Sequence, residues 1–183
     1  KEPFTLPVGA EAPFAIPKWQ KVAASYNEAT EKVFVALTRK RQFKNWREGK
    51  LGPKYHRLSE RTQWAHEMIA QKYPGDYMIV WAQFGLSWRG HSVRKVRVNY
   101  APHEFGLGPY EVGVMLLSHS ERISGDPNEL YIDCPGAEYA PDGDGRFSYA
   151  PYFYWSGVGL DFSTFWVSYP GSCLGSASAF LPQ

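Results

Sequence analysis

A run of cations interleaved with aromatic residues, RKRQFKNWREGKLGPKYHR at 39–57, has the residue types that bind nucleic acid. Lysines and arginines neutralise phosphates, and aromatic rings stack on unpaired bases. We therefore predict a nucleic-acid-binding surface. Its residues are Arg39, Lys40, Arg41, Lys44, Trp46, Arg47 and Lys50 in this run, and Arg94, Lys95 and Arg97 further along the chain. The alternative is a solvated face that Phe43 and Trp46 anchor to the core.

The charge of the chain is divided unequally between its two halves. Residues 1–100 contain 18 Lys and Arg against 8 Asp and Glu, and residues 101–183 contain 2 against 10, although the net charge is only +2. This asymmetry favours a polyanion, RNA or single-stranded DNA, as the partner of the first half. The same composition results if the acidic half packs against the basic half, so charge alone leaves both interpretations open.

Cys134 in YIDCPGAEY is the candidate nucleophile. Asp133-Cys134-Pro135-Gly136 resembles the nucleophile segment of papain-like NlpC-type hydrolases, in which the catalytic histidine follows the cysteine. Here all five histidines precede Cys134, so a thiol-dependent hydrolase would need the reverse order, with His103 or His119 as the base. Proline after the cysteine also disfavours the helix N-terminus that lowers the pKa of such thiols. We expect Cys134 not to be activated, which favours a protein that is not an enzyme.

Other candidate sites are weaker. The even pair Cys134 and Cys173 allows either a disulfide or two thiols. In APDGDGRFS, 140–148, two aspartates could bind calcium, but Arg146 stands where a third oxygen ligand is needed, and Asp-Gly pairs favour a turn. His103-Glu104 has no second metal ligand nearby in the sequence. The sequence has no phosphate loop or cofactor fingerprint, so we expect no cofactor and no metal.

Aromatic residues make up 30 of the 183 residues and gather after residue 146. Alternation in FSYAPYFYW places Phe147, Tyr149, Phe153 and Trp155 on one face of a strand and Ser148, Ala150, Tyr152 and Tyr154 on the other. The first face is core. The second carries no charge, so we expect a second sheet or a protein partner to cover it. It also allows a further alternative: a structural or carbohydrate-binding component of a virion or cell envelope.

Hydrophobic periodicity predicts helices early in the chain and strands later. We expect an extended arm at 1–16, a helix from Pro17 to about residue 30 and a second helix at 58–73. A strand is expected at 32–38, because a helix continuing there would place Lys40, Lys44 and Arg47 on its buried face. The other expected strands are 77–84, 92–100 (joined to the former by an SWRGH hairpin loop), EVGVMLL, RFSYAPYFYW, GLDFSTFWVSY and GSASAF.

These elements predict an α+β fold, with N-terminal helices followed by a mostly antiparallel, aromatic-rich sheet or two packed sheets. After the arm, residues 17–183 are expected to form one domain, and a subdivision near residue 101 stays open. No apolar run approaches the length of about 18 residues that spans a bilayer. The sequence leaves the compartment open. The favoured function is a non-catalytic binding or assembly module that contacts a polyanion.

Overall fold

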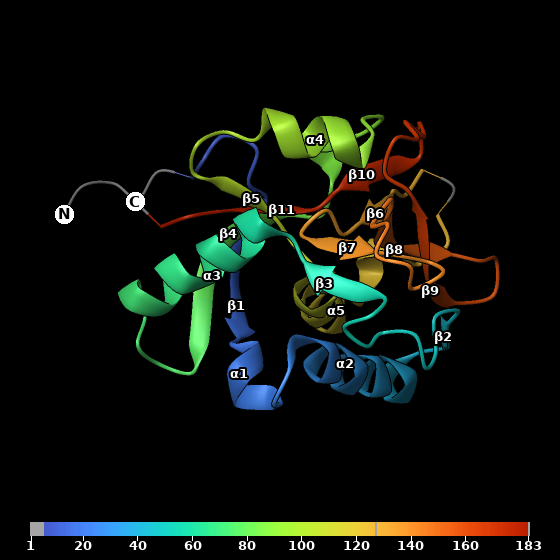
Figure 1. Ribbon diagram of the computed structural model, residues 1–183. Coiled ribbons are helices and arrows are strands. Elements are labelled where there is room, and N and C mark those ends of the chain that lie inside the picture. The colour runs from blue at the N-terminus through green and yellow to red at the C-terminus, as the bar shows by residue number, and fades with distance from the viewer. Residues whose placement is uncertain (1–5, 127, 183) are drawn as a thin grey trace.

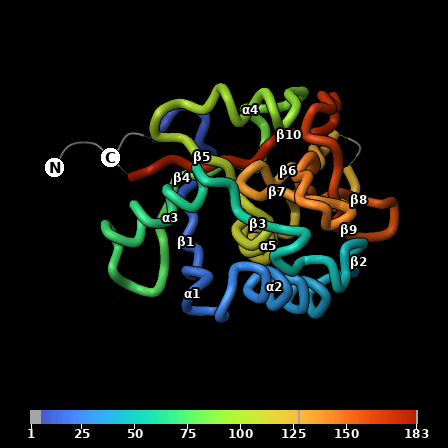
Figure 2. The backbone as a smooth tube through the Cα atoms, in the orientation of Figure 1, coloured from blue at the N-terminus to red at the C-terminus, as the bar shows by residue number. Residues whose placement is uncertain are grey.

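The computed structural model describes residues 6–126 and 128–182, and it has an α+β fold (Figure 1). Within these residues the strands form two sheets. In Figure 1 the sheet with β1 and β4 stands on the left, the sheet with β6 to β9 lies on the right, and α2 runs below the latter. The backbone trace in Figure 2 shows the C-terminal segment, in red, running from the right-hand sheet back into the left-hand one.

The four-stranded sheet has the order β1-β4-β11-β5, and its neighbouring strands are antiparallel. Its strands are β1 (Ala12–Pro17), β4 (Tyr77–Gln83), β11 (Ser178–Phe180) and β5 (Glu104–Gly106). β4 confirms the strand expected at 77–84. The extended arm is wrong for its last residues, because Phe14 and Ile16 alternate into the core and β1 is an edge strand, where Pro13 is tolerated. Residues 1–5 of the expected arm lie outside the described residues.

The seven-stranded sheet has the central order β10-β6-β8-β7-β3, and β9 joins β2 to β8. Its strands are β2 (Phe43–Asn45), β3 (His56–Leu58), β6 (Tyr131–Asp133), β7 (Ala137–Tyr139), β8 (Tyr149–Trp155), β9 (Leu160–Trp166) and β10 (Leu174–Ser176). β8 and β9 confirm the strands expected in RFSYAPYFYW and GLDFSTFWVSY, and β10 and β11 divide GSASAF. Most pairs are antiparallel, but β2–β9 and β6–β10 are parallel.

The helices are α1 (Trp19–Val22), α2 (Tyr26–Lys40), α3 (Glu60–Lys72), α4 (Val93–Asn99) and α5 (Pro109–Ser118), with short 3₁₀ turns η1 (Leu86–Trp88) and η2 (Ser120–Arg122). α3 confirms the helix expected at 58–73. The side chain of Ser59 accepts a hydrogen bond from Thr62 N, which satisfies one free N–H at the start of α3. No helix within the described residues is long and apolar enough to cross a membrane.

The strand expected at 32–38 is wrong, because α2 runs through it without a break. Ser25 caps α2 by accepting from Glu28 N at 3.2 Å, and Val33, Phe34 and Leu37 form its buried face. α2 ends at Lys40, so the two later cations that argued against a helix never lie on it. The helix expected to start at Pro17 is also corrected. Pro17 ends β1, and α1 and α2 are separate helices.

Two further expected strands are helices. At 92–100, the side chain of Ser92 accepts from Lys95 N and caps α4, which buries Val93 and Val96. EVGVMLL lies in α5, where Pro109 occupies the first turn and the carboxylate of Glu111 accepts from Gly108 N at 3.0 Å. The SWRGH segment, 87–91, contains the last two residues of η1 and leads into α4, so it is no hairpin loop. Alternation of Val96, Val98 and Tyr100 predicts a strand at 92–100, and a short apolar run between turn residues predicts one in EVGVMLL. The capping contacts of α4 and α5 favour a helix in both.

The core lies between α2 and the inner face of the seven-stranded sheet. The ring centroid of Phe34 on α2 is 4.5 Å from that of Phe162, 5.1 Å from that of Phe43 and 5.9 Å from that of Phe153. The same buried cluster continues to Phe14 of the four-stranded sheet. The opposite face of the seven-stranded sheet is covered by α4 at Ala150 and carries the exposed Trp46 at its β2 edge.

Candidate nucleic-acid interface

The basic run 39–57 begins on α2, continues through β2 and ends on β3, so its cations do not share one helical face. On β2, side chains alternate: Phe43 points into the core, whereas Lys44 points outward, and so does Trp46 just beyond the strand. The ammonium of Lys44 lies 3.4 Å from the ring centroid of Trp46, and Trp46 is 52% exposed. β2 therefore presents a cation and an aromatic ring together at the edge of the sheet.

Strand register aligns further side chains beside this pair. Lys44 is paired with Asp161 on β9, and Asp161 is paired with Tyr154 on β8. On β6, Ile132 is paired with Phe153, which places Tyr131 beside Tyr154 and Asp133 opposite Tyr152. We call this side of the sheet the outer face, defined by Lys44, Trp46, Tyr131, Asp133, Tyr152, Tyr154, Asp161 and Ser163.

The aromatic rings of the outer face form a platform. Tyr152 and Tyr154 are stacked, with ring centroids 4.9 Å apart and planes inclined by 19°. Tyr131 adds a third ring, 5.5 Å from Tyr154. The indole Nε1 of Trp46 donates to Asp161 Oδ2 at 2.6 Å, which fixes the ring orientation while leaving half of the side chain exposed. Flat, positioned rings of this kind are surfaces on which unpaired bases stack.

Asp133 is the least expected charge on this face. Burial raises the pKa of its carboxyl to about 8, and the nearby Arg97 opposes that rise. At neutral pH the protonated form therefore predominates. Trp46 and Ser156 donate to the other carboxylate, Asp161, and Lys44 is its neighbour in the β2–β9 register, so a cation accompanies this carboxylate on the outer face.

The cations at the end of α2 differ in their surroundings. Arg39 is exposed. The ammonium of Lys40 donates to Leu117 O, and the guanidinium of Arg41 donates to Ser120 O at 2.8 Å and to Ile123 O. Burial lowers the pKa of Arg41. Lys40 and Arg41 thus hold carbonyl groups at and beyond the end of α5, which is a structural contact.

Arg47 and Lys50 follow Trp46 on the turn after β2. The guanidinium carbon of Arg47 lies 5.5 Å from the ring centroid of Tyr139, and its Nε has no hydrogen-bond partner within the part of the chain that the structure describes. Lys50 is exposed, with its ammonium 6.0 Å from the centroid of Tyr55. Lys50 is therefore open to an anion, whereas Arg47 is half-buried and its Nε is enclosed.

The second group of predicted cations lies on α4, which packs through Val93 against the end of the outer face at Ala150. Arg97 is used internally: it donates to Pro135 O at 2.9 Å and to Ala137 O at 2.7 Å. Arg94 and Lys95 are exposed. Arg94 and Arg97, with Arg146 and Phe147, line a groove of about 510 Å³. Since Phe147 lies two residues before the start of β8, this groove and the tyrosine platform lie toward opposite ends of that strand.

Comparison with known proteins assigns neither a family nor a function to this chain. No family model matches the chain, and no curated protein or solved structure shows similarity to it. The function therefore rests on the chemistry of the site.

The groups that a thiol-dependent hydrolase would need do not come together around Cys134. Cys134 and Cys173 are both free, Cys134 is fully buried, and burial raises the pKa of its thiol, with Asp133 and Glu111 adding to that rise. The two candidate bases, His119 and His103, contact residues other than Cys134. His119 lies against Phe14 and 3.2 Å from Glu121 Oε1, and His103 packs on Phe180. A buried thiol with a raised pKa is a poor nucleophile.

The segment APDGDGRFS, 140–148, forms a turn, as its Asp-Gly pairs predict. Gly143 and Gly145 adopt positive φ, and Asp144 accepts from both the backbone N and the Nε of Arg146. Within residues 6–126 and 128–182, no group of three or more His, Cys, Asp or Glu side chains could hold a metal ion.

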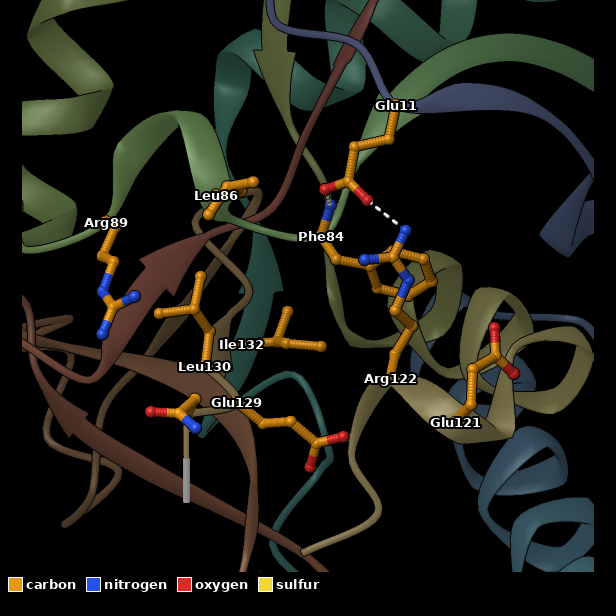
Figure 3. Close-up of a pocket in the computed structure, with 10 residues that line it drawn as sticks. Glu11, Phe84, Leu86, Arg89, Glu121, Arg122, Glu129, Leu130 and Ile132 are labelled. Carbon is orange, nitrogen blue, oxygen red and sulfur yellow. Dashed lines mark hydrogen bonds and ion pairs between the residues drawn. The ribbon is translucent and has the colours of Figure 1, made fainter. Parts of the chain in front are cut away.

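A separate pocket of about 280 Å³ lies between the two sheets, beside β4 and β6 (Figure 3). Its charges are largely matched by its own walls. Glu11 accepts from Phe84 N at 3.0 Å and pairs with Arg122, while Glu129 accepts from Ser124 and Gly125. This pocket offers an outside ligand few free groups.

Sequence reasoning missed the tyrosine platform as part of the site. Tyr131, Tyr152 and Tyr154 were not among the predicted binding residues, although alternation in FSYAPYFYW did separate Tyr152 and Tyr154 from the core side. The missing information was the pairing of β2 with β9, because parallel neighbours about 115 residues apart leave no local pattern in a sequence.

Proposed function

We propose that this protein is a non-catalytic binding module whose outer face holds single-stranded nucleic acid. The observation that carries the proposal is the alignment of Lys44 and Trp46 with three tyrosine rings across four strands. Bases would stack on the rings of Trp46, Tyr152 and Tyr154. Lys44, Arg47 and Lys50 would neutralise the phosphates along the β2 edge of the face.

The geometry favours single strands over duplex. Stacking on a ring requires a base whose face is free, and the bases of a duplex are already stacked on one another. A sheet face is also too broad to enter the major groove as a helix does. The groove beside Arg94 and Phe147 extends the same path along β8, so a longer strand would gain contacts there.

Binding of labelled oligonucleotides, followed by fluorescence anisotropy at low salt, tests this proposal. The probes are single-stranded oligouridine, a single-stranded DNA of the same length, a duplex and heparin. The variant is Tyr154→Ala. Its matched control is Tyr77→Ala, which removes a tyrosine that is 56% exposed on the other sheet.

We expect single strands to bind more tightly than duplex and heparin, and Tyr154→Ala to weaken them by about 1–3 kcal/mol. Tyr77→Ala should bind like the wild type. Equal affinity for heparin and oligouridine would show that charge alone is recognised, and equal losses in the two variants would remove the platform from the site.

A further inference from the structure

A second cavity, of about 400 Å³, opens among α1, the start of α2, β3 and α3. Trp19, Tyr26, Asn27, His56, Gln63 and His66 are among the residues that line it. Its volume lies within the range of small-molecule sites, which combine apolar and aromatic walls with a few placed polar groups. None of these residues belongs to the outer face, so the cavity is independent of the proposed nucleic-acid site.

His56 is fixed in one tautomer. Its Nδ1 lies 2.6 Å from Asn27 Oδ1, and Asn27 Nδ2 donates back to His56 O at 3.3 Å. Since the carbonyl of His56 needs a donor, the amide of Asn27 is oriented with its oxygen toward the ring, and Nδ1 must carry the proton. Burial lowers the pKa of His56 to about 4, so the ring is neutral near pH 7 and its Nε2 is a bare acceptor.

That acceptor has no partner. His56 is 1% exposed, and its Nε2 makes no hydrogen bond to any residue within the described parts of the chain. A buried polar atom left unpaired is costly, on the order of 1–3 kcal/mol. His56 Nε2 is therefore an acceptor that a hydrogen-bond donor of a ligand would satisfy.

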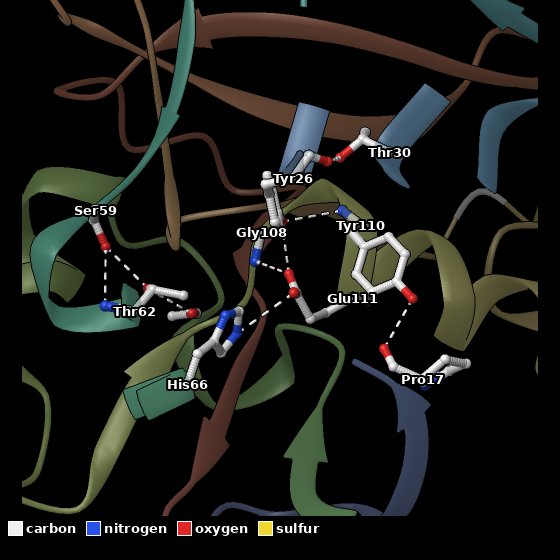
Figure 4. A network of polar contacts seen from close by, with 10 residues as sticks. Pro17, Tyr26, Thr30, Ser59, Thr62, His66, Gly108, Tyr110 and Glu111 are labelled. Carbon is white, nitrogen blue, oxygen red and sulfur yellow. Dashed lines mark hydrogen bonds and ion pairs between the residues drawn. The ribbon is translucent and has the colours of Figure 1, made fainter. Parts of the chain in front are cut away.

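His66 is the second histidine that lines the cavity, and it lies beside the carboxylate of Glu111 (Figure 4). Glu111 is fully buried on α5, and its Oε2 accepts from Tyr26 OH at 2.7 Å and from Gly108 N at 3.0 Å. The other oxygen, Oε1, lies 3.4 Å from His66 Nε2. This contact is an ion-pair distance and not a hydrogen bond, so both ring nitrogens of His66 and Oε1 of Glu111 lack a hydrogen-bond partner in the described residues.

The wall chemistry restricts the ligand. Arg57 also lines the cavity, but its guanidinium pairs with Glu138 at 2.8 Å and lies over the ring of Phe147. The unpartnered imidazole nitrogens and the nearby carboxylates of Glu67 and Glu111 disfavour an anion. The amides of Asn27 and Gln63 donate to His56 O and Leu58 O, and each has a second N–H and a further oxygen lone pair. These match hydroxyl groups, because hydroxyl groups also donate and accept. The indole of Trp19 offers an apolar surface for the C–H face of a ring. A saccharide ring combines all these properties.

We propose that this cavity binds an uncharged, polyhydroxylated ligand of about the size of one or two sugar rings, with a ligand hydroxyl donating to His56 Nε2. The step is binding only, and no bond is made or broken. The proposal assigns Asn27 as the residue that orients His56, and Trp19 as the surface against which the ring packs.

Heteronuclear NMR of the imidazole nitrogens of the wild-type protein tests this directly. The probes are the methyl glycosides of glucose, galactose, mannose and N-acetylglucosamine, with putrescine as an amine probe and inorganic phosphate as an anion probe. We expect at least one glycoside to shift the Nε2 resonance of His56 upfield and saturably, as an acceptor nitrogen does when it gains a donor. No response to any glycoside, or a response to putrescine or phosphate alone, overturns the proposal.

Two tryptophan variants provide a second measurement that does not perturb the buried histidines. Trp19→Ala should weaken binding of the active glycoside about tenfold. Trp64→Ala is the matched control, because Trp64 is 45% exposed on α3 and does not line the cavity. It should bind like the wild type. Unchanged binding by Trp19→Ala, with a saturable His56 shift, would contradict the assigned ring surface.

Discussion

At the residue scale, Trp46 combines exposure with a fixed orientation, as a stacking platform requires. Its hydrogen bond to Asp161 and the Lys44 ammonium over its ring fix the indole, and 52% of Trp46 remains exposed. We predict that Trp46→Ala weakens single-stranded RNA binding by about 1–3 kcal/mol. Trp46→Phe should retain part of the affinity, because the ring remains. Anisotropy titrations measure both, and equal affinity of Trp46→Ala and wild type would contradict this role.

The raised pKa of Asp133 makes the free energy of unfolding depend on pH between about 3.8 and 8. The folded protein keeps a proton up to about pH 8, whereas the unfolded chain loses it near 3.8, so this group lowers stability as pH rises between those values. His56 acts in the opposite sense between about 4 and 6.5, where the unfolded chain binds a proton that the folded protein does not. The two effects oppose each other below about 6.5, and only that of Asp133 remains above.

We therefore predict that the free energy of unfolding falls between pH 6.5 and 8, by up to about 1.4 kcal/mol per pH unit. Urea unfolding of the wild type and of Asp133→Asn at several pH values checks this. The variant should show a flatter pH dependence in that window. An unchanged slope in Asp133→Asn would assign the proton to another group.

The two thiols should react very differently, because Cys134 is buried with a raised pKa and Cys173 is exposed. We predict that a thiol reagent labels one cysteine rapidly in the folded protein and the second only after denaturation. In Cys173→Ser, rapid labelling should disappear. Fast modification of that variant would mean that Cys134 is accessible and ionised, which would restore the nucleophile hypothesis.

At the element scale, the parts of the fold that the sequence predicts are those with strong local patterns. α3, with Ser59 before it and Pro74-Gly75 after it, and β4, with its apolar run, were both predictable. α2 was not, because the argument assigned Lys44 and Arg47 to a helix that ends at Lys40. α4 was missed because valines spaced for a strand also fit a short helix, and the cap by Ser92 decided the outcome.

Phe34 and Val35 distinguish the helix from the rejected strand. In a strand, Val35 would share the buried face with Val33 and Leu37, and Phe34 would point to solvent. In α2, Phe34 is 5% exposed and Val35 is 52% exposed. We predict that Phe34→Ala costs about 3–5 kcal/mol of stability and that Val35→Ala changes it by less than about 1 kcal/mol. Denaturant unfolding measures both, and the reverse order would favour the strand.

The residues of the candidate site were also only partly predictable from the sequence. The cations and Trp46 could be selected from the sequence by their density, but their roles could not. Lys40, Arg41 and Arg97 hold backbone carbonyls, which no residue pattern indicates. The tyrosines join the site only through long-range strand pairing, since β8 and β2 meet across β9.

At the scale of the whole molecule, both explanations of the charge asymmetry contribute. Part of it is internal: Glu138 pairs with Arg57 at 2.8 Å and with Arg97 at 3.8 Å, and Arg61 donates to carbonyls near residue 101. Another part is presented outward, where Lys44 and Lys50 lie over aromatic rings. The central claim is that this outward part, and not the net charge, binds a polyanion.

The salt dependence of oligouridine binding tests that claim most directly. The variant Lys44→Ala/Arg47→Ala/Lys50→Ala removes three charges beside the platform, and Lys21→Ala/Lys32→Ala/Lys72→Ala removes three from α1, α2 and α3. If each site cation contacts one phosphate, the slope of log affinity against log salt should fall by roughly two in the first variant. The control should keep the wild-type slope. Equal slopes in all three proteins, or no binding by wild type at low salt, would contradict the account.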